Sequence, residues 1–192
     1  MNIIKPAAIL ALVASTASAD IFDENVLGDF SGDRFAPTFL DFQLGENTVI
    51  SQVVNSDIPG IGDRDYVTFS IAAGQSIDSI TLVNASNPAG GFDPVGFVGM
   101  AFDSIFDFNP DTFDGPGLVG FTLTTPDTIG TDILSVLSDG QSTLGPGDYS
   151  LWIQQTGADL TQIELSFNVV PAPASTALFA AAALSTSRRR RR

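Results

Sequence analysis

Hydrophobic and polar residues alternate most clearly in the C-terminal half of the chain. After a Gly-Pro-Gly turn, Tyr149, Leu151 and Ile153 fall on one side of a run, opposite Ser150, Trp152 and Gln154. A second run places apolar residues on alternate positions: Ile163, Leu165, Phe167 and Val169. A period of two residues is typical of half-buried strands. The two runs therefore predict a β-hairpin that closes a sandwich.

Further β-prone runs are separated by Gly, Pro, Asn and Asp residues: Phe39–Leu44, Thr48–Val54, Asp65–Ile71, Ser76–Val83, Val95–Phe102 and Leu118–Leu123. The first two flank Gly45-Glu46-Asn47, which predicts a second hairpin. Thr131–Leu137 fits a helical turn or a short strand equally. About eight strands, with turn signals about every 8–12 residues, predict an all-β fold, a single antiparallel sandwich or barrel.

Composition limits the class of protein. The chain has 192 residues, enough for one domain with a core, and no cysteine, so no disulfide stabilises it. All 22 acidic residues lie between Asp20 and Glu164, where Arg34 and Arg64 are the only basic residues. The body between these positions therefore carries a net charge of −20. Such a charge repels nucleic acid and attracts divalent cations, and it is typical of an acidic, salt-tolerant surface.

The N-terminus has the pattern of a secretory signal peptide. Lys5 precedes an apolar run, and small residues at Ala17 and Ala19 form a cleavage site before Asp20. The apolar run is too short to remain as a membrane span. We expect residues 1–19 to be removed and the protein to be exported.

The residue types left in the mature body exclude most catalytic chemistry. It contains no His, Cys or Lys, which removes Ser-His-Asp and Cys-His systems, Schiff-base chemistry and most zinc sites. A glycosidase would use two carboxylates, and no pair is singled out by the sequence. We expect a protein that is not an enzyme and requires no cofactor.

Calcium is the one ligand that the sequence suggests. Asp107, Asn109 and Asp111 stand at alternate positions with Asp114 just beyond, similar to the first half of a calcium loop. A second candidate site comprises Asp57, Asp63 and Asp65. The simpler interpretation of both is a solvated acidic loop. Trp152 is a candidate for stacking on a sugar, although packing against a second layer is the favoured role.

Two stretches carry a resemblance to a known family. They read DRDYVTFSIAAGQSI at Asp63–Ile77 and LGPGDYSLWIQQTG at Leu144–Gly157. Together they resemble the pre-peptidase C-terminal-like β-sandwich, in the version found in exported bacterial proteins with a PEP-CTERM sorting tail. The resemblance covers about Val49–Val169 and implies a jelly-roll-like architecture.

The C-terminus is similar to the PEP-CTERM signal itself. A Pro-x-Pro motif at Val170, Pro171, Ala172 and Pro173 precedes a short apolar stretch and a basic cluster: Arg188, Arg189, Arg190, Arg191 and Arg192. Ala172 stands where the family motif has Glu. The resemblance implies that an apolar sorting helix pauses in the inner membrane, that the arginines stay cytoplasmic, and that an exosortase-type enzyme reaches the motif.

Four segments are therefore expected: a signal peptide (1–19), an N-terminal arm with the first strand (20–47), the β-sandwich (48–169) and the sorting signal (170–192). The predicted function is non-catalytic, with a structural or adhesive role in the cell envelope, at the cell surface or in the extracellular matrix. Extracellular polysaccharide is a candidate partner. The alternative is a calcium-dependent carbohydrate-binding module.

Overall fold

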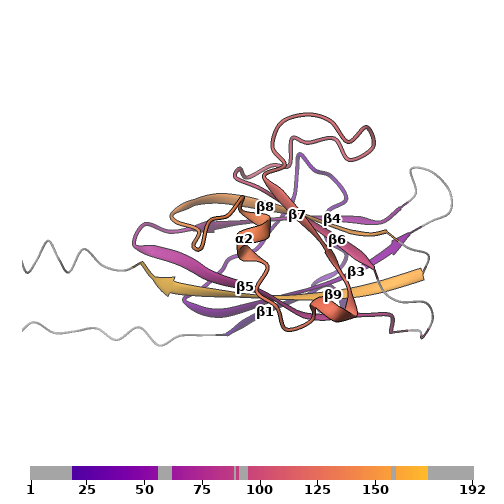
Figure 1. The fold of residues 1–192 in the computed structure, drawn as a ribbon, viewed down its shortest axis with the longest axis horizontal. Helices are drawn as coiled ribbons and strands as arrows, with labels where there is room; N and C mark the ends of the chain where they lie inside the picture. The colour runs from indigo at the N-terminus through magenta and orange to yellow at the C-terminus, as the bar shows by residue number, and fades with distance from the viewer. Residues whose placement is uncertain (1–18, 56–61, 89, 91–94, 157–158, 173–192) are drawn as a thin grey trace, which may run out of the picture.

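The computed structural model describes residues 19–55, 62–88, 90, 95–156 and 159–172, which form two facing β-sheets (Figure 1). The four-stranded sheet has the order β1 (Asp20–Asp23), β3 (Gly45–Asn55), β9 (Asp159–Pro171), β5 (Gln75–Ser86). The five-stranded sheet has the order β2 (Thr38–Phe39), β4 (Arg64–Ile71), β8 (Gly147–Gln155), β6 (Gly96–Ala101), β7 (Gly120–Thr124). The all-β prediction is confirmed, with nine strands among the described residues.

The core lies between the two sheets and follows the predicted alternation. On β4, Val67, Phe69 and Ile71 are buried, and on β8 Leu151 and Ile153 are fully buried. From the other sheet, β9 contributes its alternate residues: Ile163, Leu165, Phe167 and Val169. The core faces predicted for β8 and β9 are therefore confirmed.

The predicted hairpin between the last two strands is wrong. β8 pairs with β4 and β6, whereas β9 pairs with β3 and β5. The chain therefore crosses from one sheet to the other between these strands. Alternation alone does not distinguish the two arrangements, because an apolar face is buried equally well by a strand of the opposite sheet.

The hairpin predicted around Gly45-Glu46-Asn47 is also wrong, because those residues begin β3. The preceding segment is a strand only at β2, and it then turns inward so that Leu40 and Phe42 fill the core. The ring centroid of Phe42 lies 4.5 Å from that of Phe69. Asn47 holds the entry to β3, since its side chain accepts from the backbone N–H of Gln43 and donates to the Gln43 carbonyl.

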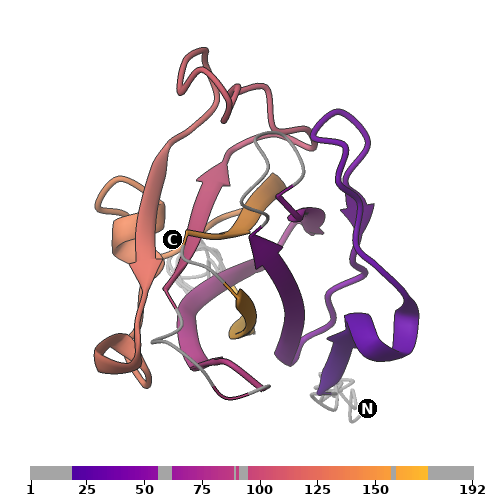
Figure 2. The same ribbon diagram turned by 90° about the vertical axis from the view of Figure 1, so that its right-hand side faces the viewer.

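The sheets are mixed rather than purely antiparallel, because the edge strands β1 and β2 pair in parallel with β3 and β4. The expected N-terminal arm contains β1 and one short helix, α1 (Glu24–Leu27). Figure 2 shows this arm on the opposite side of the molecule from β7. Asp20 pairs with Asn47, which pairs with Phe167, so the start of β1 and the last part of β9 lie at the same end of their sheet.

The remaining segments agree with the sequence. The ambiguous stretch Thr131–Leu137 contains a helical turn, α2 (Leu134–Leu137), and a 3-10 turn, η1 (Pro126–Thr128), precedes it. The strand predicted over Val95–Phe102 forms as β6 despite its two glycines. Gly96 leaves room for its neighbours, because a Cβ atom there would displace the side chains of Ile163, in the facing sheet, and Thr124. Asp103–Gly117 forms a loop that contains the first candidate calcium residues and projects at the top of Figure 1.

Candidate functional site

Three carboxyl groups from distant parts of the chain meet beside β3. Glu24 and Asp29 come from the N-terminal arm, and Asp65 comes from β4. One oxygen atom of each lies within 4.8 Å of the others. Among the described residues this is the one such group of three His, Cys, Asp or Glu side chains, and it is called the acid cluster below.

Asp65 is the most deeply buried member of the acid cluster. It shares the core-facing side of β4 with Val67 and Phe69, and its side chain is fully buried. The Ser51 hydroxyl donates a hydrogen bond of 2.5 Å to Oδ2 of Asp65, whereas Oδ1 has no hydrogen-bond partner. Burial raises the pKa of Asp65 from 3.8 to about 8, an effect that neighbouring acidic groups reinforce.

Glu24 binds the arm to the four-stranded sheet. Its carboxyl group is buried and accepts from the backbone N–H of Phe30 at 3.2 Å and of Gln52 at 2.5 Å. Burial raises the pKa of Glu24 from 4.5 to about 7, assisted by a hydrogen bond with Asp29. A hydrogen bond between two carboxyl groups requires a proton on one of them. The acid cluster therefore holds a proton near neutral pH.

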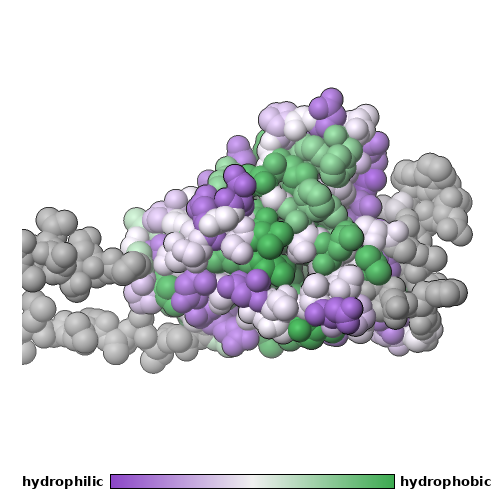
Figure 3. Space-filling view, in the orientation of Figure 1, coloured by the Kyte–Doolittle hydropathy of each residue, from purple (hydrophilic) through white to green (hydrophobic). Residues whose placement is uncertain are grey.

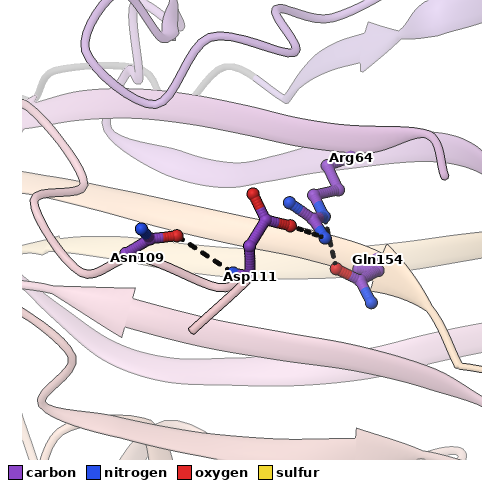
Figure 4. Close-up of polar contacts among 4 residues, drawn as sticks. All are labelled: Arg64, Asn109, Asp111 and Gln154. Atoms are coloured by element: carbon purple, nitrogen blue, oxygen red, sulfur yellow. Dashed lines mark hydrogen bonds and ion pairs between the residues drawn. The ribbon is translucent and has the colours of Figure 1, made fainter. Parts of the chain in front are cut away.

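No cationic side chain among the described residues neutralises the acid cluster. The guanidinium of Arg34 donates to the Asp107 carbonyl at 2.5 Å and lies 4.2 Å from the ring centroid of Phe35. Arg64 points toward the opposite loop, where it pairs with Asp111 (Figure 4). Asp63 lies close to the acid cluster. Its pKa is raised, chiefly by burial and secondly by the negative charge of Asp29.

In the loop predicted to bind calcium through Asp107, Asn109, Asp111 and Asp114, two of these side chains accept hydrogen bonds that form turns. Oδ1 of Asn109 accepts from the backbone N–H of Asp111 at 3.0 Å, and Oδ1 of Asp114 accepts from that of Gly115 at 2.7 Å. Arg64 contacts Asp111 at 2.7 Å and Gln154 at 2.8 Å (Figure 4), and its hydrogen bond lowers the pKa of Asp111. This loop is thereby joined to β4 and β8.

The second candidate set, Asp57, Asp63 and Asp65, is only partly described. Asp57 lies outside the described residues, and Asp63 and Asp65 lie at the acid cluster. Sequence analysis missed Glu24 and Asp29, which are far from β4 in the chain. One feature of the sequence pointed to this site. Asp65 stands at an alternate position in line with Val67, Phe69 and Ile71, so the alternation places an acidic residue on the core-facing side of the strand.

Trp152 belongs to a second apolar layer. With Tyr66, Phe97, Ala101, Phe106 and Phe108 it forms a cluster on the outer side of the five-stranded sheet. Its ring centroid lies 4.3 Å from that of Phe97, and 3% of the residue is exposed. The favoured role for Trp152, packing against a second layer, is confirmed, and the ring has no face free for a sugar.

Exposed apolar side chains gather around the edge strand β7. Figure 3 shows this apolar surface in the orientation of Figure 1. Large side chains there are about half exposed: Phe113 in the preceding loop, Phe121 and Leu123 on β7, and Val136 on α2. Phe121 rests on Phe97, with centroids 5.3 Å apart. We call Phe113, Phe121, Leu123 and Val136 the β7 surface.

The outer face of the four-stranded sheet is polar instead. A groove of about 420 Å³ lies on it, lined by Glu46, Ser79, Thr81, Val83, Ser166 and Asn168. Two of its side chains are already hydrogen-bonded: Ser166 donates to Glu46, and Asn168 donates to Asp78. The groove therefore offers hydroxyl, amide and carboxylate groups to a polar ligand.

The predicted processing residues are described in part. Ala19 and Asp20 stand at the start of β1, whereas Ala17 lies outside the described residues. Val170 and Pro171 end β9, where they pair with Ser76 and Gln75, and Ala172 donates its N–H to the Gly74 carbonyl at 2.8 Å.

Pro173 and the five arginines Arg188, Arg189, Arg190, Arg191 and Arg192 lie outside the described residues. Within the described residues, no helix has the length and apolar character to cross a membrane. Comparison of the chain with protein-family models and with curated proteins finds no match.

Proposed function

We propose that this protein is an exported, non-catalytic module with a jelly-roll-like β-sandwich, and that it has a structural or adhesive role at the bacterial cell surface or in the extracellular matrix. Residues 1–19 direct export, and residues 170–192 form a sorting signal that associates transiently with the inner membrane and is recognised by an exosortase-type enzyme. Both assignments rest on the sequence patterns at the two ends of the chain.

The observation that carries the adhesive role is the β7 surface. A sheet edge with half-exposed Phe121 and Leu123 is a site at which another molecule can be bound, since monomeric proteins seldom leave large apolar side chains grouped on one face. This edge lies across the molecule from the N-terminal arm (Figure 2).

The positions of the chain ends support a tethered module. The start of β1 and the last part of β9 lie at one end of the four-stranded sheet. A sorting signal that follows β9 therefore holds the body by that end. The opposite end of the sandwich is then directed away from the membrane.

Binding of the purified protein to isolated cell envelopes tests the adhesive role. Phe121→Ser should reduce the amount retained about tenfold, which corresponds to about 1.4 kcal/mol of lost contact. Phe39→Ser is the matched control, because Phe39 is exposed on β2 at the other edge of the same sheet. Equal retention of the two variants and the unaltered protein would contradict the proposal, provided that both variants melt as the unaltered protein does.

The groove on the four-stranded sheet favours one alternative, a calcium-dependent carbohydrate-binding module. Its Ser, Thr and Asn side chains suit the hydroxyl groups of a polysaccharide. A glycan array with and without calcium chloride distinguishes the two functions. Binding that requires calcium and is lost in Asn168→Ala would favour the alternative, whereas an array without signal would leave the adhesive role as the better account.

A further inference from the structure

The acid cluster concentrates negative charge where no basic side chain of the described residues neutralises it. Glu24 and Asp65 are buried, Asp29 is exposed, and their oxygens approach within 4.8 Å. Like charges in a poorly solvated place repel strongly, so such a group requires either protons or a cation. Both arginines of the described residues are occupied elsewhere, Arg34 at Asp107 and Arg64 at Asp111.

A second observation indicates a ligand position. Oδ1 of Asp65 has no hydrogen-bond partner, although the side chain is fully buried. Buried polar atoms in folded proteins nearly always have a partner, and an unpartnered one needs an explanation. The Ser51 hydroxyl donates to Oδ2 of Asp65, and the Asp65 carboxyl group lies beside those of Glu24 and Asp29. A bound cation satisfies Oδ1 and offsets the repulsion at the same time.

The donor set selects the class of cation. Carboxylate oxygens are hard ligands that suit calcium and magnesium. The three carboxylate oxygens lie within 4.8 Å of one another, close enough to share one ion. Calcium accepts irregular coordination by fixed protein carboxylates, whereas magnesium demands near-ideal octahedral geometry and keeps several waters. The exposed Asp29 opens the site to water molecules that complete the coordination.

We propose that Glu24, Asp29 and Asp65 bind a divalent cation, with preference for calcium, that joins the N-terminal arm to both sheets. Glu24 also accepts from Gln52 of β3, and Asp65 also accepts from Ser51 of the same strand. The ion therefore stands where the arm, β3 and β4 meet. The proposal is independent of where the protein is located and of what the β7 surface binds.

Calorimetric titration of the purified full chain with calcium chloride tests the site. One equivalent should bind with a dissociation constant of about 10⁻⁴ to 10⁻³ M, the range of extracellular modules. Magnesium chloride should bind about tenfold more weakly or not at all.

Three variants locate the ion. Asp29→Asn changes an exposed residue, so the fold should persist, and it should weaken calcium binding about tenfold or more. Asp65→Asn should abolish binding. Asp41→Asn, which removes an exposed acid away from the cluster, should leave binding within about twofold.

Two results would overturn the proposal. One is the absence of saturable heat with calcium chloride in the unaltered protein. The other is equal calcium binding by the unaltered protein and Asp29→Asn, which would show that the ion binds at another acidic loop. Asp29→Asn decides between the sites even if Asp65→Asn fails to fold.

Discussion

The hydroxyl of Ser51 on β3 donates a 2.5 Å hydrogen bond to Asp65 on β4, so a carboxyl group of one sheet is held by a strand of the other. Asp65 lies on the same face of β4 as Val67 and Phe69, which are core residues. This contact places an ionisable group at the boundary of the apolar core, and the stability of the sandwich therefore depends on how that group is neutralised.

The first prediction concerns pH. Burial raises the pKa of Asp65 from 3.8 to about 8 and that of Glu24 from 4.5 to about 7. The folded protein thus holds more protons than the unfolded chain between about pH 4 and about pH 8, so the free energy of unfolding should fall as the pH rises through this window.

Denaturant unfolding in calcium-free buffer measures this dependence. Asp65→Asn should flatten most of it, because it removes the group whose pKa is raised furthest. Asp41→Asn is the control for the loss of one exposed acid. A free energy of unfolding that rises between pH 5 and pH 8 in the unaltered protein would show that Asp65 is ionised in the fold.

The second prediction concerns the core of β8. Leu151 and Ile153 are fully buried, so replacing either with Ala should lower the free energy of unfolding by about 2–5 kcal/mol. Val136→Ala, at a residue that is 52% exposed, should change it by about 0.5 kcal/mol or less. Chemical denaturation of the three variants makes the comparison, and a small effect at Leu151 would contradict the arrangement of the core.

The third prediction separates the sorting tail from the fold. A chain ending at Ala172 should keep the melting temperature of the full chain, because β9 retains all of its pairs. A chain ending at Val169 should melt several degrees lower, since it loses the pairing of Val170 and Pro171 with β5 and the hydrogen bond from Ala172 to Gly74. Equal melting of the two truncated chains would show that these contacts contribute nothing.

The strands and the layer they face could be predicted from the sequence, because alternation records burial directly. Leu151 and Ile153 are examples. The pairing partners of each strand could not be predicted, because the alternation is the same whether β8 lies beside β9 in one sheet or opposite it in the other. Likewise the prediction found Asp63 and Asp65 but not Glu24 and Asp29, because the parallel pairing of β1 with β3 brings the arm to β4 through long-range contacts.

The fourth prediction follows from the net charge of −20 between Asp20 and Glu164. Self-repulsion weakens the compact state at low ionic strength, where the Debye length is about 30 Å at 0.01 M. Sodium chloride should therefore raise the melting temperature between about 0.01 M and about 0.15 M. A melting temperature that falls over this range would contradict the repulsion argument, because screening acts in one direction only.

Export and sorting to the cell surface are the central claim of this account. The most direct measurement is N-terminal sequencing and intact-mass analysis of the protein recovered from the cell-surface fraction. We expect a chain in that fraction that begins at Asp20, the first residue of β1. A chain that still begins at Met1 and is recovered only from the cytoplasm would contradict it.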